Sequence, residues 1–489
     1  MRAFQYQVPR IKRCMDSAAR EVAPPQPAAV KPHLGLWDIV SIILGIVIGA
    51  GIYETAPFIF QNVSSPAMGL MVWLAGGILT FIGGLCYAEL ASTYPRSGGD
   101  YVYLTKAFGR WAGFLFGWMQ LAVLMTGSIG MMAYIFADYA VTLRKFGPAS
   151  EFIYATAAVS GLSIANLVGL VFGRRTQNFL TGLKVLAIGS IVIAGFFWTE
   201  AAAAKAPIVA GSGSLGLAMI LVLYTYGGWN DAALVAAEVV DKPRNLPLAF
   251  MLGTGSLMLV YLLVNGAYLN ALGFQGARES KAIAADVLAR PFGTFGAKAM
   301  AIFVMVSALG ALNGMIYTGS RIYASLGEDY PALNWLSRWH PRRSVPVLSM
   351  LMQTAITLFL VALVGTNWGR NLINALVSLI GFEPLSWQGH GGFETLLRST
   401  APVFWAFFLM TGISVFVLRV RDSNTLRLWK VPLYPLTPLI FCAMCAYMLY
   451  SAYKYAGKLL VIGVVPVLIG LIFYWFARRS AVKPSPNQP

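Results

Sequence analysis

The sequence predicts an all-α integral membrane protein with twelve transmembrane helices. Of its 489 residues, 58% are hydrophobic and only 11% are charged, and the mean hydropathy is +0.67. Soluble domains have about 25% charged residues. Apolar runs near twenty residues long, enough for a helix to cross a bilayer, recur along the whole chain. A lipid bilayer is therefore the expected surrounding of most of the chain.

The apolar runs define the expected organisation of the chain. A basic, proline-containing stretch, residues 1–35, precedes them and is expected to be a disordered cytoplasmic tail. We expect spans 1–5 in 36–200, spans 6–10 in 214–421 with an external insertion at 366–395, the last two spans in 432–479, and a cytoplasmic tail at 480–489. The spans are predicted near 37–60, 67–92, 111–143, 150–171, 176–198, 215–239, 247–272, 297–322, 345–365, 396–419, 433–453 and 458–477.

The distribution of basic residues predicts the orientation. An even number of spans places both termini on one side, and about two thirds of the 36 Lys and Arg residues fall on that side. Basic residues are retained in the cytoplasm, so both termini are expected there, in a plasma membrane or a bacterial inner membrane. The same rule accounts for the net charge of +17 without a nucleic-acid partner.

The first predicted span is interrupted by small residues. In the apolar run 44–57, Gly49, Ala50 and Gly51 occupy the centre, where an unbroken span would have Leu or Val. Backbone that leaves the helix at membrane depth has unpaired N–H and C=O groups, and each costs several kcal/mol unless a polar group satisfies it. Such backbone is tolerated mainly where it lines a cavity. The interruption therefore predicts half of a small-molecule site.

A second interruption lies in the sixth predicted span. Gly227 and Gly228 fall within the run 224–231, and the following Asn230 and Asp231 favour local hydrogen bonds over a continued helix. Because the two interrupted spans are five spans apart, they cross the membrane in opposite senses. Taken singly, a pair of glycines in a membrane helix is more often a packing contact. Paired interruptions in two inverted halves are instead typical of a transporter site at the midplane.

Backbone electrostatics suggests the ligand. N–H groups at the start of the second half of span 1 favour an anion. Carbonyl groups at the ends of the first halves of spans 1 and 6 favour a cation. A site with both at close range suits a zwitterion, and a free α-amino acid is the obvious candidate.

Four long motifs resemble the amino acid–polyamine–organocation (APC) superfamily, in particular its L-type amino acid transporter branch and related bacterial permeases. They are GIVIGAGIYETAP (45–57), AELASTYPRSGGDYVYLTKAFG (88–109), YGGWNDAALVAAEVVDKPRNLPLA (226–249) and ALNGMIYTGSRIYASLGED (311–329). They occur in the family's order over most of the first nine spans. The resemblance implies a LeuT-like five-plus-five inverted repeat with two extra C-terminal helices.

The resemblance also implies a substrate site. The substrate carboxylate would meet backbone amides in the first interruption, and the ammonium would meet carbonyl groups of both interruptions. Tyr224 matches an aromatic residue that covers the substrate in relatives, and Asn230 matches a residue near the site in the L-type branch. The implied substrate-binding residues are Val47, Gly49, Ala50, Gly51, Ile52, Tyr224, Gly227 and Asn230.

Lys184 lies inside a predicted span with apolar sequence on both sides, where an unpaired charge is expensive. By resemblance, its charge stands where a sodium-coupled relative of this fold keeps a cation and braces spans 1 and 8. Two interpretations remain open. Lys184 is either a permanently charged strut bonded to carbonyls of the first interruption, or a group whose protonation is linked to transport.

Two acidic residues are less clearly assigned. Glu54 departs from the family pattern, which often has a neutral or basic residue there. It would face the cavity and favour a cationic substrate, or pair with a basic residue at the outer mouth. Glu238, at the cytoplasmic end of span 6, is expected to belong to a packing and gating cluster with Arg96 as a candidate partner.

The sequence offers little support for other classes of function. It has no GxSxG elbow, P-loop or HExxH motif and no clustered His and Cys, so no enzyme activity, metal or cofactor is predicted. Transport is then secondary, as proton-coupled symport or amino acid exchange. An amino acid sensor on the same scaffold and a polyamine or cationic amino acid transporter are the alternatives. No obligatory protein partner follows from the sequence, and a homodimer remains open.

Overall fold

The computed structural model describes residues 32–477 except 50, 199–214, 281, 380, 382 and 385–391. This part of the chain is helical, apart from an isolated bridge between Leu34 and Val239. Its helices are α2 (Leu36–Val47), α3 (Gly51–Gln61), α4 (Pro66–Thr93), α5 (Asp100–Phe108), α6 (Arg110–Met119), η1 (Gln120–Leu124), α7 (Met125–Leu143), α8 (Ser150–Val168), α9 (Leu170–Phe197), α10 (Leu215–Thr225), η2 (Trp229–Glu238), α11 (Lys242–Glu279), α12 (Ile283–Asp329), η3 (Pro331–Ser337), α13 (Val347–Gly365), α14 (Asn367–Leu379), α15 (Gly392–Arg421), α16 (Leu436–Ala456), η4 (Gly457–Leu459) and α17 (Leu460–Ala477).

Nine helical segments of the described residues are long and apolar enough to cross a membrane. The expectation of an all-helical, multi-pass membrane protein is confirmed at this level. Two shorter apolar helices, Leu36–Val47 and Gly463–Ala477, fall within the first and last predicted spans. The nine segments are Pro66–Thr93, Arg110–Leu143, Ser150–Val168, Arg175–Phe197, Lys242–Glu279, Ile283–Asp329, Val347–Gly365, Leu396–Arg421 and Leu436–Ala456.

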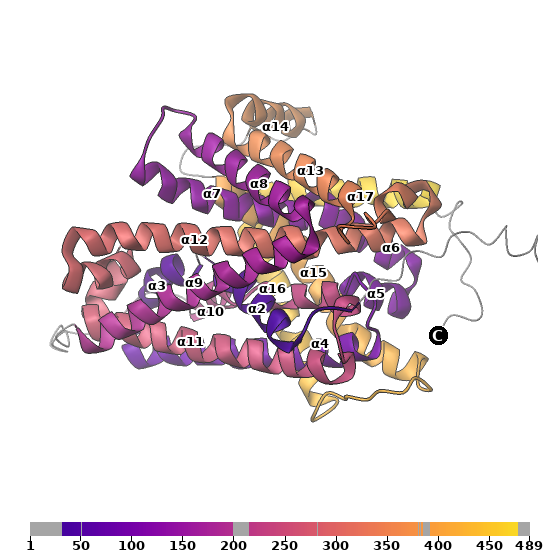
Figure 1. Cartoon of the computed structure of the whole chain (residues 1–489), viewed down its shortest axis with the longest axis horizontal. Helices are drawn as coiled ribbons and strands as arrows, with labels where there is room; N and C mark the ends of the chain where they lie inside the picture. Colours follow the sequence, from indigo (N-terminus) through magenta and orange to yellow (C-terminus); the bar gives the residue numbers. More distant parts are fainter. Residues whose placement is uncertain are drawn as a thin grey trace, which may run out of the picture.

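The helices with interruptions lie inside the bundle. Figure 1 shows α2, α3 and α10 between the two longest helices, α11 and α12. Ile43, Ile46 and Ile52, on both sides of the first interruption, are at most 3% exposed. Irregular backbone between them is thereby shielded from lipid.

Two glycines bend the long helices at one end of the bundle. Gly273, inside α11, has φ 68°, and Gly293, inside α12, has φ 56°. Both values favour glycine because a Cβ would crowd the backbone there. Residues 274–279 form the end of α11 and residues 283–296 the start of α12. The helix α14 lies within the predicted insertion 366–395.

The predicted N-terminal tail falls mostly outside the described residues. Its last part packs against η2: the backbone N–H groups of His33 and Leu34 both donate to the Glu238 carbonyl, at 2.8 and 2.9 Å. Leu34 is fully buried. The packed chain thus begins before the predicted boundary at residue 35. The predicted C-terminal tail, residues 480–489, lies outside the described residues.

Candidate functional site

The helix α2 ends at Val47 in a tight turn. Ile48 has φ −72° and ψ 73°, and the N–H of Gly49 donates to the Val47 carbonyl at 2.7 Å. This geometry is an inverse γ-turn, which cannot continue a helix. The chain resumes as α3 at Gly51, whose amide stands in the first turn of a new helix. The N–H groups of that turn have no partner within α3. Ala50 lies outside the described residues.

The end of α2 is anchored by three side chains from three other helices. Lys184 of α9 is fully buried and donates to the carbonyls of Gly45 and Ile48, at 2.5 and 2.7 Å. Ser307 of α12 donates to the Ile48 carbonyl at 2.8 Å. Tyr261 of α11 donates to the Val47 carbonyl at 2.9 Å. These contacts satisfy carbonyls that a helix end leaves without partners.

These hydrogen bonds limit the ability of the Val47 carbonyl to bind a ligand. Its carbonyl oxygen accepts from both Gly49 and Tyr261, so both of its lone pairs are used. A substrate ammonium would have to displace Tyr261 to reach it. The Tyr224 carbonyl accepts from the Gly227 N–H at 3.0 Å.

The helix α10 ends at Thr225, and a left-handed residue separates it from η2. Gly228 has φ 103°, and a Cβ on this residue would lie 2.8 Å from Ile46 Cγ2. Only glycine suits both the backbone angle and the close approach to α2. The ten-residue η2 that follows is a 3-10 helix. Such helices rarely exceed four residues, and longer ones often mark a hinge.

The two interruptions contact each other. A Cβ on Gly51 would lie 3.2 Å from Thr225 Cγ2, and the hydroxyls of Thr55 and Thr225 are 2.9 Å apart. Tyr261 lies between the two helix ends, because its hydroxyl is also 3.3 Å from the Thr225 carbonyl. These contacts hold the end of α2, the start of α3 and the end of α10 together. We call this contact region the joint.

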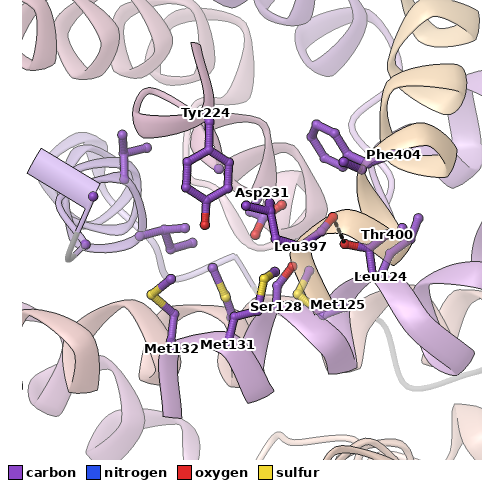
Figure 2. Close-up of a pocket in the computed structure, with 18 of the residues that line it drawn as sticks. Leu124, Met125, Ser128, Met131, Met132, Tyr224, Asp231, Leu397, Thr400 and Phe404 are labelled. Atoms are coloured by element: carbon purple, nitrogen blue, oxygen red, sulfur yellow. Dashed lines mark hydrogen bonds between the residues drawn. The ribbon is translucent and has the colours of Figure 1, made fainter. Parts of the chain in front are cut away.

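A cavity of about 150 Å³ opens beside this joint (Figure 2). A water molecule needs about 10–15 Å³ of such space, so the cavity holds roughly ten water-sized groups, the size of a free amino acid. Figure 2 shows the Tyr224 ring over the cavity, with its hydroxyl directed toward Met131 and Met132. The lining residues are Ile46, Val47, Gly49, Gly51, Gln120, Leu124, Met125, Ser128, Met131, Met132, Leu223, Tyr224, Thr225, Gly227, Gly228, Asn230, Asp231, Met315, Leu397, Thr400, Ala401, Phe404 and Trp405.

The cavity brings together six residues that the resemblance named. Val47, Gly49 and Gly51 come from the first interruption, and Tyr224, Gly227 and Asn230 come from the second. The other named residues lie elsewhere. Ile52 is buried but does not line the cavity. Lys184 binds carbonyl groups at the end of α2 and does not line the cavity either. The side chain of Glu54 is outside the described part of the chain.

Other cavity residues were missed because nothing in one sequence fixes which way a helix faces. The side-chain wall comes from α7 and α15, through residues such as Met125, Met132, Thr400 and Phe404. Gln120 and Leu124 belong to η1, a π-helical turn between α6 and α7. Such turns are frequent at functional sites. Asp231 also lines the cavity, although its sequence position indicated only a local hydrogen-bonding role.

At the end of η2, a buried ion pair corrects the expectation for the partner of Glu238. Glu238 pairs with Arg321 of α12 at 2.8 Å, and their side chains are 1% and 0% exposed. Arg96, the candidate partner of Glu238, instead pairs with Glu328 and Asp329, at 3.1 and 2.8 Å. The contact between Arg96's loop and η2 is made by backbone, where the Gly98 N–H donates to the Leu234 carbonyl at 3.0 Å.

The sequence model of the "Amino acid permease" family matches residues 34–477, nearly the whole described chain. The chain belongs to this family. The resemblance to the APC superfamily is thereby confirmed. The protein is a multi-pass membrane protein that transports amino acids, and it is a transporter rather than an enzyme.

Curated relatives cover most of this permease. "Large neutral amino acids transporter small subunit 2" of Mus musculus is 29% identical over 472 residues, 93% of this chain and 83% of the relative. "Serine/threonine exchanger SteT" of Bacillus subtilis is 27% identical over 463 residues, 92% of this chain and 98% of the relative. "Asc-type amino acid transporter 1" of Mus musculus is 27% identical over 478 residues, 93% and 83% of the two chains.

Proposed function

We propose that this permease binds a free amino acid in the cavity between the ends of α2, α3, α10 and η2 and moves it by alternating access. The observation that supports the proposal is that two interrupted apolar helices, far apart in sequence, meet at one cavity of amino-acid size. The substrate carboxylate would meet the amides at the start of α3, from Gly51 and Ile52 with Ala50. The ammonium would face the carbonyls of Tyr224 and Gly227.

The proposed architecture has twelve spans. The stretch α2–α3 would be one interrupted span and α10–η2 another, and the two would begin the inverted halves 36–200 and 214–421. The units 432–479 and 366–395 would be the two additional spans and the external insertion. Both termini would be cytoplasmic, as the excess of basic residues on their side favours. Glu238 and Arg321 would then close the cytoplasmic side.

We propose exchange as the transport mode. The Bacillus relative is named an exchanger, and the buried Lys184 is held by two carbonyls in a way that suits a fixed strut. A lysine that anchors α2 in every state needs no proton cycle. Proton-coupled symport is the competing mode, and it requires Lys184 to release its proton during the cycle.

Counterflow in proteoliposomes tests the proposal. Vesicles containing the purified protein are loaded with an unlabelled amino acid mixture and diluted into labelled amino acid. Exchange predicts a transient accumulation of label that disappears when the vesicles are empty of amino acid. Binding of labelled amino acid without any flux would instead support the sensor. Uptake that needs an inward proton gradient, and not internal amino acid, would support symport.

A further inference from the structure

The cavity contains one acidic side chain and no basic one. Among the described residues that line it, Asp231 is the only charged residue. The residue is 9% exposed, and among the described residues the only hydrogen bond of its carboxylate is a long one, 3.4 Å, from the Asn230 amide. No Lys, Arg or His of the described chain forms an ion pair with it. An isolated carboxylate in such surroundings is costly, so it requires either a proton or a cationic partner.

The neighbouring acid shows how a structural carboxylate is satisfied here. Asp100 is buried beside Asp231, but hydroxyl groups of Tyr87 and Thr411 donate to it, the latter at 2.7 Å. Asp231 has no such donors. The contrast indicates that Asp100 belongs to the packed core of the protein, whereas Asp231 is left available to something in the cavity.

A second unsatisfied atom points in the same direction. The side-chain oxygen of Asn230 is buried and has no hydrogen-bond partner among the described residues. Two adjacent residues of the cavity lining therefore have poorly satisfied acceptors: Asn230 Oδ1 has no donor among the described residues, and Asp231 accepts only the long bond from the Asn230 amide. A ligand group with several N–H donors and a positive charge would satisfy both at once.

The position of Asp231 separates it from the proposed head-group site. In Figure 2 Asp231 lies on the Phe404 and Leu397 side of the Tyr224 ring, while the ends of α2 and α3 lie on the opposite side of the view. An amino acid whose carboxylate meets the start of α3 would therefore extend its side chain toward Asp231. Met125 and Leu397 also line the cavity and suit the aliphatic stem of such a side chain.

We propose that Asp231, with Asn230, is a receptor for a positively charged substrate side chain, so that the permease prefers amino acids ending in a guanidinium or ammonium group. This inference rests on the proposed function, because it assumes that the amino acid binds in this cavity. It assigns specificity to Asp231, on η2, rather than to Glu54.

Arginine and citrulline provide the test, because they have nearly the same shape and differ in side-chain charge. In counterflow with the full-length protein, each is used to compete with a labelled substrate. A charged hydrogen-bonded pair predicts that arginine competes at roughly tenfold or more lower concentration than citrulline. In Asp231→Asn, which keeps the shape, the arginine-to-citrulline ratio should fall to within about twofold. Asp231→Glu, which keeps the charge, should retain a preference for arginine.

Asp286→Asn is the matched control. Asp286 is an exposed residue of α12 outside the cavity that bonds to Ser280, and its substitution should leave the ratio unchanged. The proposal is overturned if the wild-type protein does not prefer arginine, or if Asp231→Asn weakens both competitors equally. Robust counterflow of neutral amino acids without a charge preference would overturn this inference alone. Absence of any amino acid counterflow, with or without a competitor, would overturn the proposed function as well.

Discussion

Glu238 and Arg321 form a buried ion pair, and we predict that removing both charges destabilises the protein less than the two single variants together would suggest. Arg321 Nε lies 2.8 Å from Glu238 Oε1, Tyr317 donates to Oε2 at 3.2 Å, and both charged side chains are at most 1% exposed. Removing one partner leaves an uncompensated buried charge, which costs about 3–5 kcal/mol. Arg321→Met and Glu238→Gln should each lower the free energy of unfolding. Arg321→Met leaves the buried charge of Glu238, and Glu238→Gln leaves the buried charge of Arg321, so each single variant should show this cost.

Because the double variant removes both charges, it should lose much less than the two single variants together. We expect a coupling energy of about 2 kcal/mol or more from the double-mutant cycle, since contacting residues in one network couple by about 0.5–3 kcal/mol. Reversible unfolding in mixed micelles of SDS and a mild detergent measures these free energies. Arg96→Met, which breaks a half-exposed pair with Glu328 and Asp329, is the control and should cost at most about 1 kcal/mol. Strictly additive losses for Glu238 and Arg321 would refute the reasoning.

Three further substitutions test the joint around the cavity. Lys184→Ala removes two charge-assisted bonds worth about 1.5–3 kcal/mol each, so uptake should be lost at every pH; retained uptake would contradict the anchoring role, and retained uptake that still depends on pH would also exclude a proton-coupling role for Lys184. Gly228→Ala places a Cβ 2.8 Å from Ile46 Cγ2 at a φ of 103°, and equilibrium binding of labelled amino acid should weaken at least about tenfold; wild-type affinity would contradict the geometry. Tyr224→Ala should raise the Kd while Tyr224→Phe retains it, because the ring rather than the hydroxyl covers the cavity; equal Kd values for the two variants would argue against a covering role.

The sequence was most informative where local chemistry decides the structure. Long apolar runs predicted helices because nothing else satisfies backbone groups in lipid. The glycines at 49, 51, 227 and 228 predicted the places where helices end, since α2 stops at Val47 and α10 at Thr225. Six residues named from the family motifs line one cavity, although substrate binding by them stays a prediction.

The rest depends on how the helices pack, which one sequence does not fix. The partner of Glu238 is Arg321, 83 positions away, whereas Arg96 pairs with Glu328 and Asp329. Met125 and Phe404 line the cavity only because of the rotation of α7 and α15 about their axes. Asp231 was interpreted from its local preference for turns, and its isolation from basic groups became visible only when the surrounding helices were placed.

The central claim is that an amino acid binds between the ends of the two interrupted helices. Its most direct test is an experimental structure of the protein with its transported amino acid bound. The account predicts the substrate carboxylate at the Gly51 amide and the ammonium at the Tyr224 carbonyl, with the Tyr224 ring over the ligand. An amino acid bound at any other place, with this cavity left without substrate, would contradict it.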